Sequence, residues 1–484
     1  MTRGNMKKHY INCAVMLVLT FGIGFLPEFG NITPLGMQVL GIFIGTIYGW
    51  CTLGLLWPSL YALVMLGSTE VCTVSEAFSQ AFGNTTPLIL ISVFVLAAYL
   101  EESGLSQYIA NWFISRKIGE GRPWVFTFLI CAAAYILSAF VSLYATIVII
   151  WAIFYRICES IHVERKSSYA TMVIGLIVII SSITGMLFPF KVFSQVSYGL
   201  IVNATGTKYE IDFLNWTLFN FIISILLLAL FFLVARFILR PDMEAVKKAG
   251  EHFAYLRDEK MNHEQKVAMG VLVVFILIQV LPSFLPTSWP VVALMQDWAI
   301  LGGVSLCMIF LSMWHKEDGK PYVDIGKLIS KGTNWDIVVL LGAIIPISNA
   351  LESEQTGIMD TILGWLSSTL SGFSGTMLLV IVVLLFLTVT QFANNMLLMT
   401  IFIPMLSKLG LEYGIHPFVI ANLIHLSAQS AFLMPGSSSQ AAMIYGNTEW
   451  VSNKIALRYN VSYILIAYVV LLGVGIPLAQ FLFH

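Results

Sequence analysis

The sequence has very little charge for its length. Only 11% of its 484 residues are Asp, Glu, Lys or Arg, whereas soluble proteins contain about 25%. Because this number of charged groups cannot cover a water-facing surface, the composition excludes a cytosolic enzyme and a free nucleic-acid-binding protein. The 25 basic and 26 acidic side chains nearly cancel, and the net charge of −1 indicates neither an acidic nor a basic partner.

Cysteine is also scarce, and patterns typical of enzymes are missing. The six cysteines are scattered, mostly within apolar segments, without the spacing of a disulfide framework or a metal site. Neither a His-Glu-x-x-His nor a Gly-x-Ser-x-Gly pattern occurs, which argues against a membrane-embedded enzyme. No small-residue cleavage site follows the apolar segment after Lys8, so this segment is predicted to be the first membrane span.

Long apolar segments dominate what remains. Apolar residues make up 58% of the chain, and the mean hydropathy is +0.86. A helix rises about 1.5 Å per residue, so roughly 20 residues cross the hydrocarbon core of a bilayer. The sequence therefore predicts an all-α polytopic membrane protein. The apolar segments cover residues 11–27, 36–69, 84–100, 124–157, 168–200, 216–239, 267–285, 296–314, 335–351, 374–407, 417–446 and 460–483.

The positions of Lys and Arg predict the path through the membrane. Basic residues concentrate in cytoplasmic loops, and one path satisfies them all only if 36–69 crosses twice and 124–157 does not cross. Residues 124–157 then form a re-entrant hairpin from the cytoplasmic side, and 374–407 form one from outside. We expect eleven spans and two hairpins, with the N-terminus in the cytoplasm and the C-terminus outside.

Recurring landmarks predict an internal duplication. A segment that begins Leu-Glu and ends at Gly104 recurs before Gly357, 357 − 104 = 253 residues later. The two predicted hairpin tips lie 252 residues apart, and two proline-containing breaks lie 246 residues apart. Each copy would hold five spans and one hairpin. An odd number of crossings inverts the copies, which is typical of secondary transporters with a site at the midplane.

These patterns divide the chain into four parts. We expect an N-terminal transmembrane helix in residues 1–35 and a first inverted repeat in 36–240. A cytoplasmic linker in 241–266 would lead to the second inverted repeat in 267–484.

Polar residues interrupt the apolar sequence at four places, namely the two hairpin tips and two breaks within 168–200 and 417–446. Irregular backbone at membrane depth needs protein or a water-filled cavity to satisfy its polar groups. Hydroxyls, amides and helix N-termini there could bind an anion, and carbonyls could bind a cation. The polar residues that we predict to bind substrate are Ser142, Tyr144, Thr146, Lys191, Gln195, Asn394, Asn395, Ser437, Ser438, Ser439 and Gln440.

Lys191 is the most unusual of these residues. An ammonium within a membrane span indicates function, although Lys191 would reach the surface if its span ended near Phe190. His425 could relay protons or be a hydrogen-bonded structural histidine. Any single serine could serve only to join neighbouring helices.

The four places resemble the divalent anion:sodium symporter family, whose members carry dicarboxylates, citrate and sulfate. Residues 138–142 and 390–392 are similar to the approaches to the Ser-Asn-Thr motifs at that family's hairpin tips, and 335–342 to the start of its ninth span. The chain is thereby identified as a divergent member, with the resemblance covering nearly its whole length. It implies a homodimer in which the hairpin-bearing half moves like an elevator against a scaffold.

The hairpin tips depart from the family motif. At the first tip only Ser142 matches, and Tyr144 stands where Thr is usual. At the second tip only Asn395 matches, and Met396, which the resemblance also assigns to substrate binding, replaces Thr. The exchanges at Tyr144 and Met396 predict a smaller or more apolar pocket, and an aromatic or monovalent acid is a conceivable substrate.

The resemblance also implies that the hairpin tips and the two breaks bind two sodium ions. The residues at the breaks, like those at the tips, differ from the family motif. Lys191 stands where Gly is usual, and Gln195 where Asn is usual. We therefore predict that the first sodium site is absent and that Lys191 supplies a built-in positive charge. It would pair with an anionic substrate or change its protonation state during transport. Transport would then be proton-coupled, of the exchange type, or dependent on fewer sodium ions. The residues left for one sodium site are Asn394, Asn395, Pro435 and Ser438.

We predict a secondary active transporter of small organic or divalent anions, resembling di- and tricarboxylate carriers, in the inner or plasma membrane. No enzymatic activity, nucleic-acid partner or cofactor other than a sodium ion is expected. One alternative is a cation or proton exchanger of the same superfamily, although the predicted site contains no carboxylate at membrane depth. Another is a non-transporting membrane sensor, although no loop is long enough for a soluble output domain.

Overall fold

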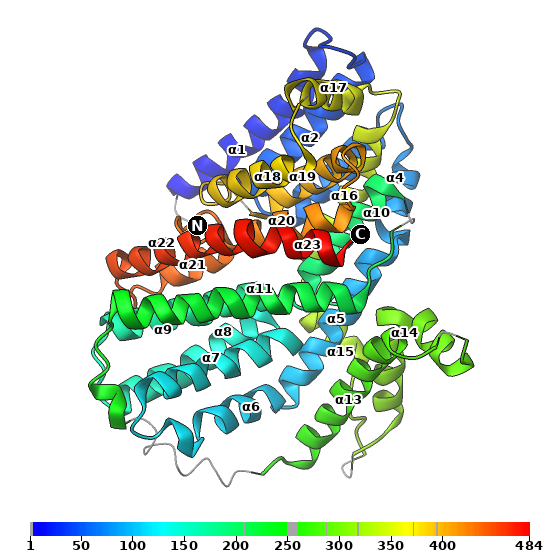
Figure 1. Cartoon of the computed structure of the whole chain (residues 1–484). Helices are drawn as coiled ribbons and strands as arrows, with labels where there is room; N and C mark the ends of the chain where they lie inside the picture. Colours follow the sequence, from blue (N-terminus) through cyan, green and yellow to red (C-terminus); the bar gives the residue numbers. More distant parts are fainter. Residues whose placement is uncertain are drawn as a thin grey trace.

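The protein is built of helices (Figure 1). The computed structural model describes residues 3–206, 209–248, 260–286, 288–316, 319–370, 372–393 and 395–484. Within these ranges no β-strand is formed, and nine helices are long and apolar enough to cross a membrane. The predicted class, an all-α polytopic membrane protein, is confirmed.

The helices of the first half begin with α1 (Arg3–Gly22), α2 (Pro34–Thr52), α3 (Leu56–Leu66), α4 (Val74–Gly83), α5 (Thr85–Glu102) and α6 (Leu105–Ile114). They continue with α7 (Pro123–Phe140), α8 (Leu143–Ser160), α9 (Ser168–Thr184), α10 (Val192–Thr205) and α11 (Phe213–Val234). Much of the predicted linker 241–266 lies outside the described residues.

The second half contains α13 (His263–Val280), α14 (Pro290–Met313), α15 (Ile325–Gly332), α16 (Trp335–Glu352) and α17 (Ile358–Leu370). It ends with α18 (Gly375–Val389), α19 (Asn395–Glu412), α20 (Pro417–Gln429), α21 (Ser439–Gly446), α22 (Asn453–Val470) and α23 (Ile476–Leu482).

The segment 36–69 is divided into two helices, as its length predicts. Thr33 starts α2 by accepting a hydrogen bond from Gly36 N, and Pro34 occupies the first helical position. The turn before α3 contains Gly54 with a φ of +109°, a conformation that favours glycine. Helix α3 has only 11 residues and is about 16 Å long, so the second crossing predicted for this segment stays a prediction.

Helices α7 and α8 form an antiparallel hairpin that packs on α9. Thr127 and Tyr169 share a hydrogen bond near the starts of α7 and α9, and Ser138 donates to Ser181 O near their ends. Phe154, towards the end of α8, instead packs against Tyr169 at the start of α9. Thus α7 runs parallel to α9, and α8 runs antiparallel to α9. Only two residues connect α7 to α8.

Helices α18 and α19 repeat this arrangement on α20. Thr390 at the end of α18 donates to Ala428 O near the end of α20, which makes these helices parallel. Near the end of α19, Gly410 lies against Ile420 close to the start of α20, where a Cβ would come within 2.2 Å of the isoleucine side chain. Helix α19 is therefore antiparallel to α20.

The two breaks lie slightly earlier in the sequence than predicted. The chain is non-helical between α9 and α10 at 185–191 and between α20 and α21 at 430–438. Gln195, Ser439 and Gln440, which were expected in non-helical stretches, lie in the first turns of α10 and α21. The reason is local, because Ser438 caps α21 by accepting from Ala441 N, so the helix begins directly after it.

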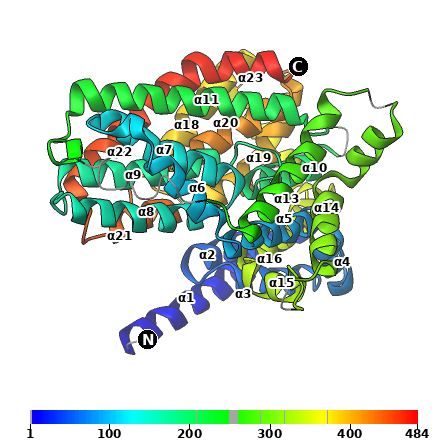
Figure 2. The same cartoon turned by 90° about the horizontal axis from the view of Figure 1, so that it is seen from below.

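The helices form two groups, which are visible in Figure 2. The first, here called the hairpin group, comprises α7–α11 and α18–α23. The second, called the scaffold group, comprises α1–α5 and α13–α16. Helix α10 packs against α5 and α16 and so lies at the boundary between the groups.

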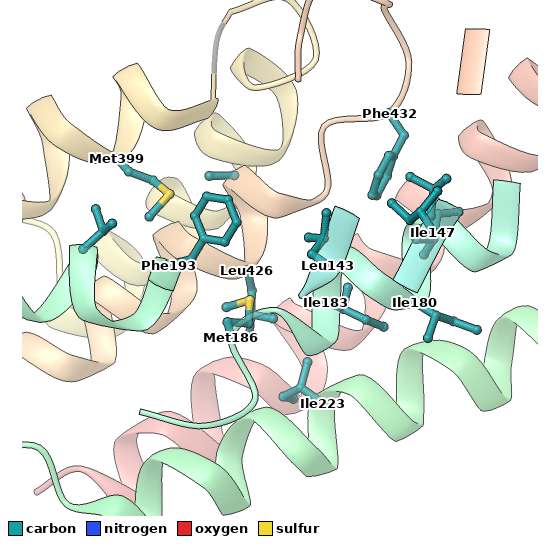
Figure 3. Close-up of a cluster of buried hydrophobic side chains, with 14 of the residues drawn as sticks. Leu143, Ile147, Ile180, Ile183, Met186, Phe193, Ile223, Met399, Leu426 and Phe432 are labelled. Atoms are coloured by element: carbon teal, nitrogen blue, oxygen red, sulfur yellow. The ribbon is translucent and has the colours of Figure 1, made fainter. Parts of the chain in front are cut away.

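Apolar side chains from both hairpins and both broken spans meet in the hairpin group (Figure 3). Leu143 of α8 and Ile183 of α9 are buried here, together with Phe193 of α10, Met399 of α19 and Leu426 of α20. This shared core packs the two hairpins into one body.

Candidate functional site

The Lys191 side chain lies against the tip of the first hairpin. It leaves the break before α10, and only 5% of the residue is exposed. Its Nζ donates to Ser138 O at 2.8 Å and to Val141 O at 2.7 Å. Both carbonyls belong to the C-terminal end of α7, which ends at Phe140. Because carbonyls at a helix C-terminus lack partners and carry a partial negative charge, the ammonium completes the end of α7.

The charge of Lys191 has no ionic partner among the described residues. Two of its three N–H donors are used. The residue lines a cavity of about 70 Å³ together with Ser142 and Tyr144. The opposite wall consists mostly of apolar side chains from α5 and α16, such as Phe94 and Ile337. A buried cation on a residue that lines a small cavity favours an anion there.

The other predicted residues of the first tip have different surroundings. Ser142 caps α8 by accepting from Ala145 N. The Tyr144 hydroxyl forms a 2.7 Å hydrogen bond with Ser439 Oγ, which joins the first hairpin to the start of α21. Thr146 is buried, and its hydroxyl has no partner in the described part of the chain. Sequence reasoning did not anticipate the link between Tyr144 and Ser439, because 295 residues separate them.

Gln195 faces a second and larger cavity. Its Nε2 donates to Pro189 O at 2.8 Å, whereas its Oε1 has no partner among the described residues. It lines a cavity of about 710 Å³ with Glu210 and Asp212, and Lys191 does not line this cavity. The structure therefore separates two predicted site residues that are only four positions apart.

Two of the four residues predicted for a sodium site, Asn395 and Ser438, use their side-chain oxygens within the protein. Ser438 Oγ donates to Ala431 O at 2.7 Å and accepts from Ala441 N. Asn395 Oδ1 accepts from Met396 N. Pro435 is exposed, and Asn394 lies outside the described residues.

The remaining predicted residues cluster around the second break. Asn395 N donates to Ser437 O at 3.3 Å, so the second tip touches the break between α20 and α21. The Ser437 hydroxyl donates to Met434 O. Gln440 is buried, and its Oε1 accepts from Ser439.

Gln391 is a central residue that is missing from the predicted set. It is 2% exposed and follows α18 at the second tip. Its Nε2 donates to Leu387 O and Ser430 O, and its Oε1 accepts from Phe432 N and Leu433 N. A glutamine inside an apolar segment is the same signal that indicated Lys191, and it could have been used here.

Contacts within the two halves correspond. Ser138 Oγ donates to Ser181 O in the first half, and Thr390 Oγ1 donates to Ala428 O in the second. The donors lie 390 − 138 = 252 residues apart, and the acceptors 428 − 181 = 247. These offsets agree with those of the sequence landmarks.

Residues 39–424 match the family model described as citrate transporter. The chain belongs to this family. Curated relatives include the sodium-dependent dicarboxylate transporters SdcS of Staphylococcus aureus strains USA300 and NCTC 8325, each 22% identical over 454 residues. The alignments cover 88% of this chain and 82% of each relative. The predicted kinship with carriers of dicarboxylates and citrate is thus confirmed.

The fold is similar to the crystal structure of the Alcanivorax borkumensis YdaH transporter. The TM-score is 0.52 at 15% sequence identity, over 97% of this chain and 98% of that chain. Because the family and the curated relatives are transporters, this member of the citrate transporter family is a multi-pass membrane transporter and not an enzyme.

Proposed function

We propose that the protein is a secondary active transporter of small organic anions with carboxylate groups. The family description and the dicarboxylate relatives support the substrate class. The observation that carries the proposal is the buried residue Lys191, which lines a cavity and whose ammonium has no ionic partner among the described residues. A substrate carboxylate in this cavity would provide that partner.

The cavity lies where relative motion of the two groups would transport its contents. Lys191, Ser142 and Tyr144 belong to the hairpin group, and Phe94 and Ile337 belong to the scaffold group. If the hairpin group slides along the scaffold, an anion bound to Lys191 moves with it, past apolar walls that offer no competing charge. This is the elevator motion that the family resemblance implies, and a homodimer would hold the scaffold in place.

While it is protonated, Lys191 would also place a cation at the first hairpin. Its two hydrogen bonds place a positive charge at the C-terminal end of α7, where carbonyl oxygens would otherwise be available to a metal ion. Sodium at this position would meet an ammonium of the same charge.

Uptake of radiolabelled succinate and citrate by proteoliposomes tests the function. Wild-type protein should transport at least one of them, and Lys191→Ala and Lys191→Gly should lose most of this activity. Both variants leave room beside Ser138 O and Val141 O, so sodium or methylammonium should restore part of it. Full activity with unchanged ion dependence in both variants would contradict the role of Lys191.

No observation favours the alternative of a cation exchanger. Such a protein needs a carboxylate at its site, whereas the buried ionisable group at the first hairpin tip is a lysine. Melting curves with dicarboxylates, tricarboxylates, sulfate and monocarboxylates would separate these classes, because stabilisation by an anion supports the proposed function.

A further inference from the structure

Gln391 joins the second hairpin to the second break with every polar atom of its side chain. The two Nε2 bonds, to Leu387 O and Ser430 O, are each 3.0 Å long. The two Oε1 bonds, from Phe432 N and Leu433 N, are each 3.1 Å long. These neighbours determine the orientation of the amide, because a flipped amide would place oxygen against two carbonyls and N–H groups against two N–H groups. The side chain is fully hydrogen-bonded and has no acceptor left for a ligand.

Lys191 and Gln391 occupy corresponding junctions. Lys191 extends from a break to the end of α7, and Gln391 extends from the end of α18 to the other break. The hairpin carbonyls that they engage, Ser138 O and Leu387 O, lie 387 − 138 = 249 residues apart. In each half, one buried side chain with N–H donors thus joins the end of the first hairpin helix to the neighbouring break.

These donors occupy the oxygens that a metal cation would need. Carbonyls at the end of a helix and in a non-helical break are natural ligands for a small cation. At the first junction two carbonyl oxygens accept hydrogen bonds from the Lys191 ammonium. At the second junction two carbonyl oxygens accept hydrogen bonds from the Gln391 amide nitrogen. An N–H donor at 2.7–3.0 Å from a carbonyl oxygen stands where the cation would bind. The two junctions therefore fit side-chain donors and do not fit sodium.

We propose that Lys191 and Gln391 together replace the coupling cations, and that the protein exchanges one carboxylate anion for another without sodium. This inference rests on the proposed function. Exchange is expected while Lys191 stays protonated, because a hairpin group without substrate would carry the ammonium past apolar walls with no anion to compensate it. A bound anion removes this cost in both directions of movement.

Counterflow in proteoliposomes of the full chain tests the inference. We expect labelled succinate or citrate to enter vesicles preloaded with the same anion about tenfold faster than empty vesicles. The rate should be the same, to within about twofold, in sodium, potassium and choline salts. A sodium requirement in the wild-type protein would overturn the inference, as would equal rates into loaded and empty vesicles.

Gln391→Glu provides the sharper test. The substitution keeps the size of the side chain but replaces Nε2, with its two N–H donors, by one carboxylate oxygen that faces Leu387 O and Ser430 O. Exchange should fall roughly tenfold or more in choline, because buried carbonyls lose their donors, and sodium should restore it by binding between these oxygens. Gln391→Met removes the donors without adding oxygens, so it should be impaired in every salt. Gln107→Glu on the exposed surface of α6 is the matched control and should behave as wild type.

Melting temperature separates failure of this inference from failure of the proposed function. Sodium should leave the melting temperature of the wild type unchanged and should raise that of Gln391→Glu. This measurement needs no substrate. If no anion is transported in any salt while sodium has these effects, the proposed function is wrong. The inference that the two junctions bind no sodium in the wild type is then still supported. If sodium stabilises the wild type, or leaves a folded Gln391→Glu unaffected, the inference is wrong.

Discussion

The ion pair between Glu352 and Lys408 should contribute measurably to stability. Glu352 ends α16 in the scaffold group, and Lys408 belongs to α19 in the hairpin group. Their charged atoms are 2.7 Å apart, and the side chains are only 13% and 25% exposed. The other carboxylate oxygen of Glu352 has no partner within the described residues, so the lysine alone compensates this charge.

The burial of the pair determines the expected magnitude. At 2.7 Å and an effective dielectric constant of about 20, the Coulomb attraction is roughly 6 kcal/mol. Removing both ions from water offsets much of it. Breaking a fully buried pair costs about 3–5 kcal/mol, whereas an exposed pair contributes about 0–1 kcal/mol. For this partly exposed pair we expect a coupling energy of about 2 kcal/mol.

A double-mutant cycle with Lys408→Met, Glu352→Gln and the double variant measures this coupling. Lys408→Met should lower the melting temperature by roughly 2–4 °C, since the shift per kcal/mol decreases with chain length. The double variant should be more stable than the sum of the single effects predicts. The matched control is the pair of Lys327 and Glu102, which is 48% and 50% exposed at 2.9 Å and should show a much smaller coupling energy, because solvent screens exposed charges.

The same pair predicts an opposite effect on rate. Because it joins the two groups, it must break whenever the hairpin group slides, so Glu352→Gln should exchange anions faster than wild type despite lower stability. A coupling energy indistinguishable from that of the control pair would refute the reasoning about burial. Unchanged exchange would refute relative motion at this contact.

Two smaller predictions concern single residues. Tyr144→Phe removes the hydrogen bond to Ser439 and should destabilise the protein by about 1 kcal/mol. Thermal unfolding in detergent would detect this change. An unchanged melting temperature would show that the bond contributes nothing. In the capping box before α4, the backbone and hydroxyl of Thr73 donate to Glu76 and lower its pKa. A lowered pKa stabilises the folded state above the unfolded pKa, and this contribution is lost as the pH falls through the folded pKa. The difference in melting temperature between wild type and Glu76→Gln should therefore be present at pH 7 and disappear in acid, and a difference that persists at pH 2 would contradict this.

The sequence alone determined the class of the protein and the approximate positions of its elements. Scarce charge and long apolar segments require a membrane environment. The chain has too few charged groups to cover a surface that faces water, and apolar surface is unfavourable in water. The interruptions near Ser142, Lys191 and Pro435 were visible because polar groups are rare at membrane depth. Family membership was also accessible, since the layout of spans persists where motifs have changed.

Only the tertiary structure decided what the polar residues bind. A sequence shows that Lys191 is an ammonium in an apolar segment, but not that its partners are the carbonyls of Ser138 and Val141, about fifty positions earlier. Backbone carbonyls are identical in every residue, so no side-chain pattern marks which of them lack partners. For the same reason the sequence did not show which four backbone groups bind the side chain of Gln391. These contacts depend on how helices distant in the sequence pack, and the packing decides whether such a residue binds a ligand or completes the fold.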